Sequence, residues 1–145
     1  MNTLQNINES WKWKNIEAVE IIQTNDFGNV IFKNSEEEYW RICPEEVSCE
    51  KLAGNKLEFE NLVGQTEFIK DWEMKNLVEM AKSKLGKLSA NQSYCLKMPA
   101  PIGGKYEESN LGKIDFSELL SFSGDLARQI ENLKDGDEIR FEIKN

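Results

Sequence analysis

The sequence of 145 residues contains no histidine. Histidine is the side chain whose ordinary pKa lies closest to neutral pH, and it is the commonest general base in enzymes. Its absence excludes Ser-His and Cys-His nucleophile pairs. An enzyme built on this chain would have to use carboxylates, lysine or a metal held by oxygen atoms, so catalysis is the less favoured class of function.

Cysteine is also scarce, with three residues at positions 43, 49 and 95. An odd number at no metal-like spacing predicts reduced, partly buried thiols, although the spacing of Cys43 and Cys49 leaves a disulfide between them open. A zinc site is not expected, because structural zinc usually takes four cysteine or histidine ligands. The sequence predicts no metal, no cofactor and no catalytic residue.

Long apolar runs and a basic excess are missing as well. No stretch approaches the roughly 20 apolar residues of a membrane helix, and the N-terminus has neither the basic nor the apolar region of a secretory signal. We therefore expect a cytoplasmic protein that does not act at a membrane. The net charge of −8 argues against nucleic-acid binding and suits a basic protein partner, without fixing an oligomeric state.

What the chain does contain is a series of short strands and amphipathic helices. Strands are predicted at residues 18–22, 30–32, 39–43, 94–98, 111–114 and 139–143, and longer helices at 66–85 and 116–133. The first three strands indicate an antiparallel meander, and Pro44 begins a largely helical stretch that runs to residue 92. Gly86 is expected to end one helix and Asp115 to cap the other. This order predicts an α+β fold, a mainly antiparallel sheet with helices packed on one face.

Residues 1–16 are predicted to form a polar arm, either irregular or a short helix, before a single domain at residues 17–145. Trp11 lies in this arm and either anchors it on the domain or faces a partner. Ser123 and Gly124 fall in the middle of the last predicted helix. They cost helix propensity, and we expect them to let another backbone approach closely.

The most acidic part of the chain is residues 35–50, with six acidic residues and one arginine. A solvated turn and helix start would explain them, and a contact patch for a basic partner is the functional alternative, because their spacing matches no calcium loop. The residues predicted to bind a partner are Glu36, Glu37, Glu38, Tyr39, Glu45, Glu46 and Trp11, with Tyr39 or Trp11 as an aromatic anchor. Arg41 and Trp40 are expected in a buried cation–π or ion-pair cluster.

A second candidate site is the loop that contains Gly103 and Gly104. It lacks the frame of a P-loop, so we expect its glycines to supply positive φ and to let the chain cross another element closely. Tyr106 and Glu107 would then stand at the loop exit, within reach of a partner. The segment 121–124 is not a nucleophile motif, because the chain has no histidine to activate a serine.

Four blocks, in order along the chain, resemble a family of bacterial domains. They are YWRICPEEVSCEKLA at 39–53, DWEMKNLVEMAKSKLG at 71–86, YCLKMPAPIGGKYEESN at 94–110 and LLSFSGDLARQIENLKDGDEIRFEI at 119–143. The family is the C-terminal domain of type VI secretion immunity proteins that neutralise DNase toxins, and the resemblance covers about residues 17–143. It implies a cytoplasmic antitoxin that binds a cognate toxin and blocks its active site or its assembly without catalysis.

Three classes of function follow from these observations. The leading one is a toxin-neutralising protein whose acidic surface occludes the basic cleft of a nuclease. The second is a small-ligand or regulatory binding module that uses the Gly103-Gly104 loop, which an apolar pocket beside Tyr106 would favour. The third is an enzyme, which would need two or more carboxylates converging in a cleft.

Overall fold

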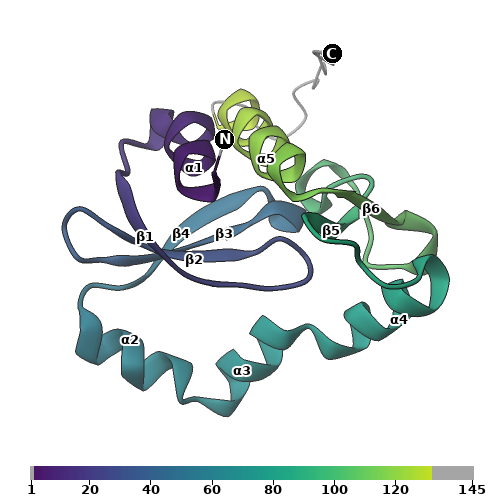
Figure 1. The fold of residues 1–145 in the computed structure, drawn as a ribbon, viewed down its shortest axis with the longest axis horizontal. Coiled ribbons are helices and arrows are strands. Elements are labelled where there is room, and N and C mark those ends of the chain that lie inside the picture. The colour runs from purple at the N-terminus through teal and green to yellow at the C-terminus, as the bar shows by residue number, and fades with distance from the viewer. Residues whose placement is uncertain (1, 132–145) are drawn as a thin grey trace.

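Within residues 2–131, which the computed structural model describes, two antiparallel sheets form the centre of the fold (Figure 1). The larger sheet has the strand order β1-β2-β3-β4, and the smaller one pairs β5 with β6. The strands are β1 (Ala18–Thr24), β2 (Val30–Asn34), β3 (Tyr39–Cys43), β4 (Ser48–Ala53), β5 (Gln92–Leu96) and β6 (Leu111–Asp115). The helices are α1 (Thr3–Ser10), α2 (Lys56–Val63), α3 (Thr66–Glu73), α4 (Lys75–Leu85) and α5 (Phe116–Ile130), with short 3-10 turns η1 (Lys12–Lys14), η2 (Pro44–Glu46), η3 (Ala100–Ile102) and η4 (Glu108–Asn110).

The larger sheet contains the predicted three-stranded meander and one strand more. The helical prediction that starts at Pro44 is right for η2 and wrong for β4. Val47 follows η2 with φ 52°, a left-handed conformation that turns the chain back, and Ser48–Ala53 then pairs antiparallel with β3. The sequence does not predict β4, because the two residues at its centre, Glu50 and Lys51, are polar and exposed and interrupt the apolar alternation of a strand. The strand exists because of its pairing with β3, which no local pattern records.

Helices α1 and α5 cover one face of the larger sheet (Figure 1). The core between them and the sheet includes Ile7, Trp11, Val30, Phe32, Ile42, Leu120 and Leu126. At the contact of the two helices, a Cβ on Gly124 would lie 2.4 Å from the carbonyl oxygen of Ser10. The close backbone approach expected at Gly124 is therefore confirmed, and α1 is the element that approaches.

The N-terminal segment takes part in this core. The side chain of Asn6 donates hydrogen bonds to the backbone oxygen of Ser117 at 2.9 Å and to its hydroxyl at 2.8 Å. Asn8 exchanges two hydrogen bonds with the backbone of Ala18. Of the two forms predicted for this segment, an irregular arm or a short helix, the structure has the helix, joined to α5 and β1. Trp11 is buried among the core residues at 1% exposure.

Helices α2 and α3 contact the opposite face of the larger sheet. Tyr39 and Arg41 alternate along β3 with residues that face α1 and α5, so they point the other way. The Tyr39 ring stacks on Phe59 of α2 with centroids 4.2 Å apart, and the Arg41 guanidinium lies 5.1 Å from the ring centroid of Trp72 on α3. The predicted α+β class is confirmed, and these contacts add helices on a second face.

The helix predicted at 66–85 is divided in two. Met74 has φ 47° and separates α3 from α4. Gly86 ends α4 with φ 83°, and the Asp115 side chain caps α5 by accepting a hydrogen bond from the Glu118 N–H, both as predicted. The strand predicted at 139–143 lies outside the described residues. Among the helices of residues 2–131, none combines the length and the apolar character that crossing a membrane requires.

Candidate partner-binding surface

Charge is unevenly distributed over the fold. Residues 2–73, which form α1, the larger sheet, α2 and α3, carry 15 acidic and seven basic side chains. Residues 74–115, which form α4 and the smaller sheet, carry four acidic and seven basic side chains. The acidic character of the protein therefore belongs to the larger-sheet half, where a cationic partner would be attracted.

Five of the six acidic residues of 35–50 fall into two groups at opposite ends of β3, and the sixth, Glu50, is exposed on β4. The first group lies on the turn between β2 and β3, where Glu36 and Glu37 are exposed. Glu38 is engaged within the protein: Lys51 lies 2.8 Å from its carboxylate, Asn34 donates a hydrogen bond to it, and these contacts lower its pKa. Glu36 and Glu37 are thus the two members of this group that are exposed toward solvent.

The second group lies on η2. Glu45 is only 6% exposed, and its carboxylate oxygens accept hydrogen bonds from Asn29 Nδ2 at 3.1 and 2.9 Å. Burial raises the pKa of this carboxyl to about 7. Glu46 is exposed and accepts a hydrogen bond from the hydroxyl of Tyr106. Glu46 and Tyr106, which the sequence assigns to separate sites, are therefore in contact in the structure. Glu45, which the sequence assigns to the partner-binding surface, is buried.

Tyr39 and Trp11, the two expected aromatic anchors, are buried in the protein. Tyr39 packs against Phe59 of α2, and Trp11 stacks on Trp13 with centroids 5.8 Å apart. Neither presents its ring on the surface of the described residues, so a partner would have to find its anchor elsewhere.

The loop between β5 and β6 needs both of its glycines. Gly103 has φ 106°, and a Cβ on Gly104 would lie 1.6 Å from the carbonyl oxygen of Met98. The predicted conformational role of the two glycines is confirmed. Tyr106 lies at the exit of this loop and is 45% exposed, with its hydroxyl directed toward Glu46 on η2. Glu107, the next residue, is also exposed.

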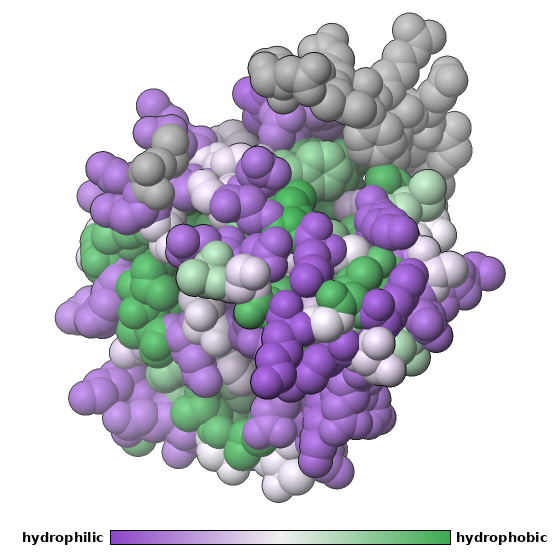
Figure 2. Space-filling view, turned by 45° about the vertical axis from the view of Figure 1, so that its right-hand side comes forward, coloured by the Kyte–Doolittle hydropathy of each residue, from purple (hydrophilic) through white to green (hydrophobic). Residues whose placement is uncertain are grey.

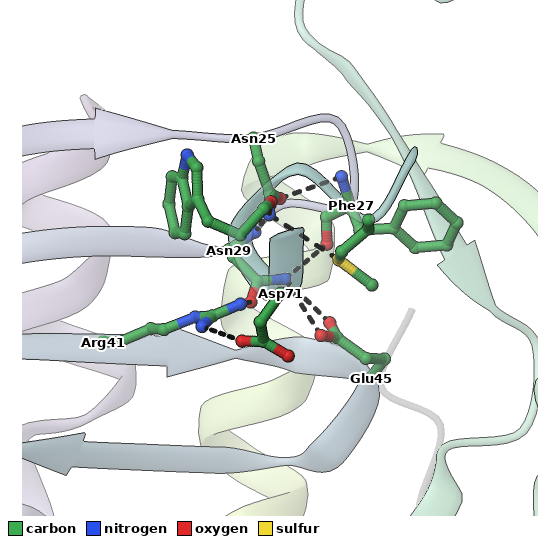
Figure 3. Close-up of polar contacts among 8 residues, drawn as sticks. Asn25, Phe27, Asn29, Arg41, Glu45 and Asp71 are labelled. Atoms are coloured by element: carbon green, nitrogen blue, oxygen red, sulfur yellow. Dashed lines mark hydrogen bonds and ion pairs between the residues drawn. The ribbon is translucent and has the colours of Figure 1, made fainter. Parts of the chain in front are cut away.

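A buried polar network joins β3 to η2 and α3 (Figure 3). Arg41 donates from Nε and one terminal nitrogen to Asn29 Oδ1, at 3.0 and 2.8 Å, and from the other terminal nitrogen to Asp71 at 2.6 Å. The amide nitrogen of Asn29 continues the chain to Glu45. The ion pair expected of Arg41 is confirmed, but its aromatic partner is Trp72 of α3. The expected pairing with Trp40 is wrong, because Trp40 packs against the core on the other face of the sheet.

Asn25 extends the network to the turn between β1 and β2. Its side-chain oxygen accepts from the N–H groups of Phe27 and Asn29, both at 3.0 Å. Its amide nitrogen donates to the Trp72 carbonyl oxygen at 2.9 Å. Asn25 and Asn29 read from sequence as turn residues alone, and nothing local indicates that they connect this turn to β3 and α3.

A groove of about 360 Å³ lies next to the network, between the end of β1 and α3. We call it the β1–α3 groove, and its walls include Asn25, Asp26, Phe68, Ile69, Trp72 and Glu73. Ile69 is 40% exposed, and Trp72 is buried. No local pattern indicates this groove, because its residues come from separate elements that only the tertiary fold brings together.

A second hollow, of about 540 Å³, lies against the smaller sheet and α5. Its residues are largely apolar and include Pro44, Pro99, Ile114, Leu119 and Phe122. Figure 2 brings the side of α4 and the smaller sheet forward and shows hydrophobic patches separated by hydrophilic side chains. The hollow reaches η2 through Pro44 and the start of the glycine loop through Pro99, but Gly103, Gly104 and Tyr106 are not among the residues that line it. It is an apolar pocket, and it lies away from the place beside Tyr106 where the small-ligand alternative expected one.

The thiols are free in the structure. Cys49 pairs with Ile42 across the sheet and Cys43 with Ser48, so the two cysteines point to opposite faces and the disulfide left open by the sequence does not form. Burial raises the pKa of both thiols to about 12. Within residues 2–131, no cluster of three or more cysteine, aspartate or glutamate side chains is placed to hold a metal ion.

The family model described as "T6SS immunity protein Tdi1, C-terminal" matches residues 53–127, just over half of the chain. The matched segment runs from the end of β4 through α5 and includes the α3 side of the groove and the glycine loop. No curated protein sequence matches the chain.

Proposed function

The chain belongs to the family of the T6SS immunity protein Tdi1 C-terminal domain, and from this premise we propose that it is a non-catalytic protein that binds a cognate toxin and blocks it. We propose further that the toxin is a nuclease effector with a basic substrate cleft. The observation that carries the mechanism is the concentration of acidic side chains in residues 2–73. A nuclease cleft is shaped to neutralise phosphates, so an acidic protein surface competes for the same charges. The protein would then act in the cytoplasm, with the DNA that it protects.

The absence of catalysis rests on the chemistry of the available side chains. The chain has no histidine. Glu45, the buried acidic residue of the described part of the chain, is held by Asn29 and does not stand open to a substrate. Asp26 and Glu73 share the β1–α3 groove, but both are solvent-exposed, which does not provide the buried surroundings that tune a general acid or base. These features favour binding over reaction chemistry.

A binding titration with a DNase-inactive variant of the candidate cognate toxin tests the proposal. The double reversal Glu36→Lys with Glu37→Lys should weaken binding, because it inverts two exposed charges on the acidic half. The matched control is Glu79→Lys with Glu108→Lys, which makes the same charge change at exposed positions in residues 74–115. Equal affinities for the two double variants would remove the acidic half from the mechanism, and no binding by the unaltered protein would reject the immunity role.

A second candidate function is supported by the hollow against the smaller sheet. At about 540 Å³ it falls within the range of small-ligand pockets, and most of the residues that line it are apolar. Ligand binding would raise the melting temperature by mass action. We expect the fluorescent apolar probe anilinonaphthalene sulfonate to bind the native protein if this function holds, and Leu119→Trp, which fills the hollow, to abolish that signal. If the native protein does not increase the fluorescence of the probe, the small-ligand function is rejected.

A further inference from the structure

The β1–α3 groove combines two kinds of surface. Phe68, Ile69 and Trp72 supply an apolar wall, and Asp26 and Glu73 supply two carboxylates. Among the described residues that line the groove, none is basic. An occupant therefore needs an apolar portion and a positive charge at the same time.

The groove is small and firmly supported. Its volume of about 360 Å³ has room for a long side chain rather than for a helix or a strand. Two contacts hold Trp72 in place: the Arg41 guanidinium lies over its ring, and Asn25 donates a hydrogen bond to its carbonyl oxygen. Asp71, the residue before it, is held by Arg41 at 2.6 Å. A wall that is already ordered loses little conformational entropy when a partner binds.

We propose that the β1–α3 groove receives a single lysine or arginine side chain of the toxin. The aliphatic stem of that side chain lies along Ile69 and Phe68, and its cationic head reaches Asp26 and Glu73. Lysine and arginine are the side chains that present an apolar stem and a charged tip together. This inference rests on the proposed function and adds to it the place and the chemistry of one anchor.

A purely apolar anchor fits the groove less well. Such a side chain would leave the two carboxylates beside it without a counter-charge and would strip water from them, which costs free energy. The surrounding acidic half of the molecule adds to the attraction for a cation. Charge complementarity therefore selects the basic side chain over leucine or phenylalanine.

The test compares two isosteric double variants in titrations with a DNase-inactive variant of the candidate cognate toxin. Asp26→Asn with Glu73→Gln neutralises the groove and keeps its shape. Glu9→Gln with Glu79→Gln, on α1 and α4, makes the same charge change at exposed positions outside the groove. We expect the groove variant to lose about tenfold in affinity or more, and the control to change less than about twofold, because distant charges are screened within about 10 Å at ordinary salt. Ile69→Ser should also lower the affinity, by several-fold.

The outcomes separate this inference from the proposed function. A wild-type protein that binds, with groove and control variants that bind equally, would overturn the groove while leaving the immunity role intact. Loss of affinity in Ile69→Ser without loss in the charge variant would replace the cation by an apolar anchor and also overturn it. Failure of the wild-type protein to bind rejects the proposed function and the groove with it. Melting temperatures of all three variants close to that of the wild type confirm that affinity, and not folding, is measured.

Discussion

Arg41 is a charged side chain whose surroundings are mostly neutral. It is buried, it shares two hydrogen bonds with the amide oxygen of Asn29, and its ion-pair partner Asp71 has a side chain that is 70% exposed. The charge is thus solvated by an amide and an aromatic face on one side and by a water-exposed carboxylate on the other. One side chain in this way fixes the position of α3 on the sheet.

We expect Arg41→Ala to destabilise the protein by about 2–3 kcal/mol, because it leaves Asn29 Oδ1 without its donor in a buried site and removes the cover of Trp72. Asp71 loses its partner at lower cost, since water can reach it. The control is Arg128→Ala on α5, whose exposed pair with Asp125 at 3.6 Å should contribute about 0.5 kcal/mol or less. Urea unfolding measures the free energy of unfolding of both variants. Equal decreases in Arg41→Ala and Arg128→Ala would contradict this account of Arg41.

Glu45 predicts a dependence of stability on pH. Its pKa is about 7 in the folded protein, above the ordinary value of 4.5, so the folded state holds the proton more tightly than the unfolded state. The resulting stabilisation is complete below about pH 4.5 and is lost as the pH rises through 7, a change of about 3 kcal/mol. Glu45→Gln should remove this component and be relatively more stable at pH 8 than at pH 5. Parallel stability curves for variant and wild type from pH 5 to 8 would contradict the assignment.

At the scale of elements, the contact of α1 with α5 sets the position of the N-terminal segment. Gly124→Ala should favour the helical conformation by up to about 1 kcal/mol. We nevertheless expect a net decrease in the free energy of unfolding of about 2 kcal/mol or more. The new Cβ would clash with the backbone oxygen of Ser10, which cannot move without the rest of α1. Gly64→Ala is the control, since its nearest neighbours lie 3.6 Å away and its φ is −84°. Thermal unfolding compares the two, and a Gly124→Ala protein as stable as the control would show that α1 can yield.

The elements also show how far sequence reasoning reaches. β3, the start of α5 and the end of α4 are encoded locally, by side-chain alternation, by Asp115 and by Gly86. β4 and the β1–α3 groove are not, because they depend on partners distant in the chain. The sequence shows that residues 35–50 are rich in acidic side chains. Which of these side chains are exposed, as on the turn between β2 and β3, and which are buried, as Glu45 is, follows only from the tertiary structure.

For the whole molecule, the family-matched segment and the folding unit differ in extent. The match begins at residue 53, whereas α5 packs on Ile7, Trp11, Val30 and Phe32, which all precede that residue. We expect a fragment of residues 53–127 to lack cooperative unfolding, because Leu120 and Leu126 would have nothing to cover them. The full chain is the control in the same circular dichroism melt. A sharp transition in the fragment would show that the matched segment folds alone.

The same contact has a consequence for when the protein becomes active during synthesis. Asn6 leaves the ribosome before its partner Ser117, which follows 111 positions later. The nascent chain therefore holds α1 without its partner until α5 has emerged, and the core between them closes only then. Under the proposed function, a chain released before α5 would lack this core and would not neutralise a toxin.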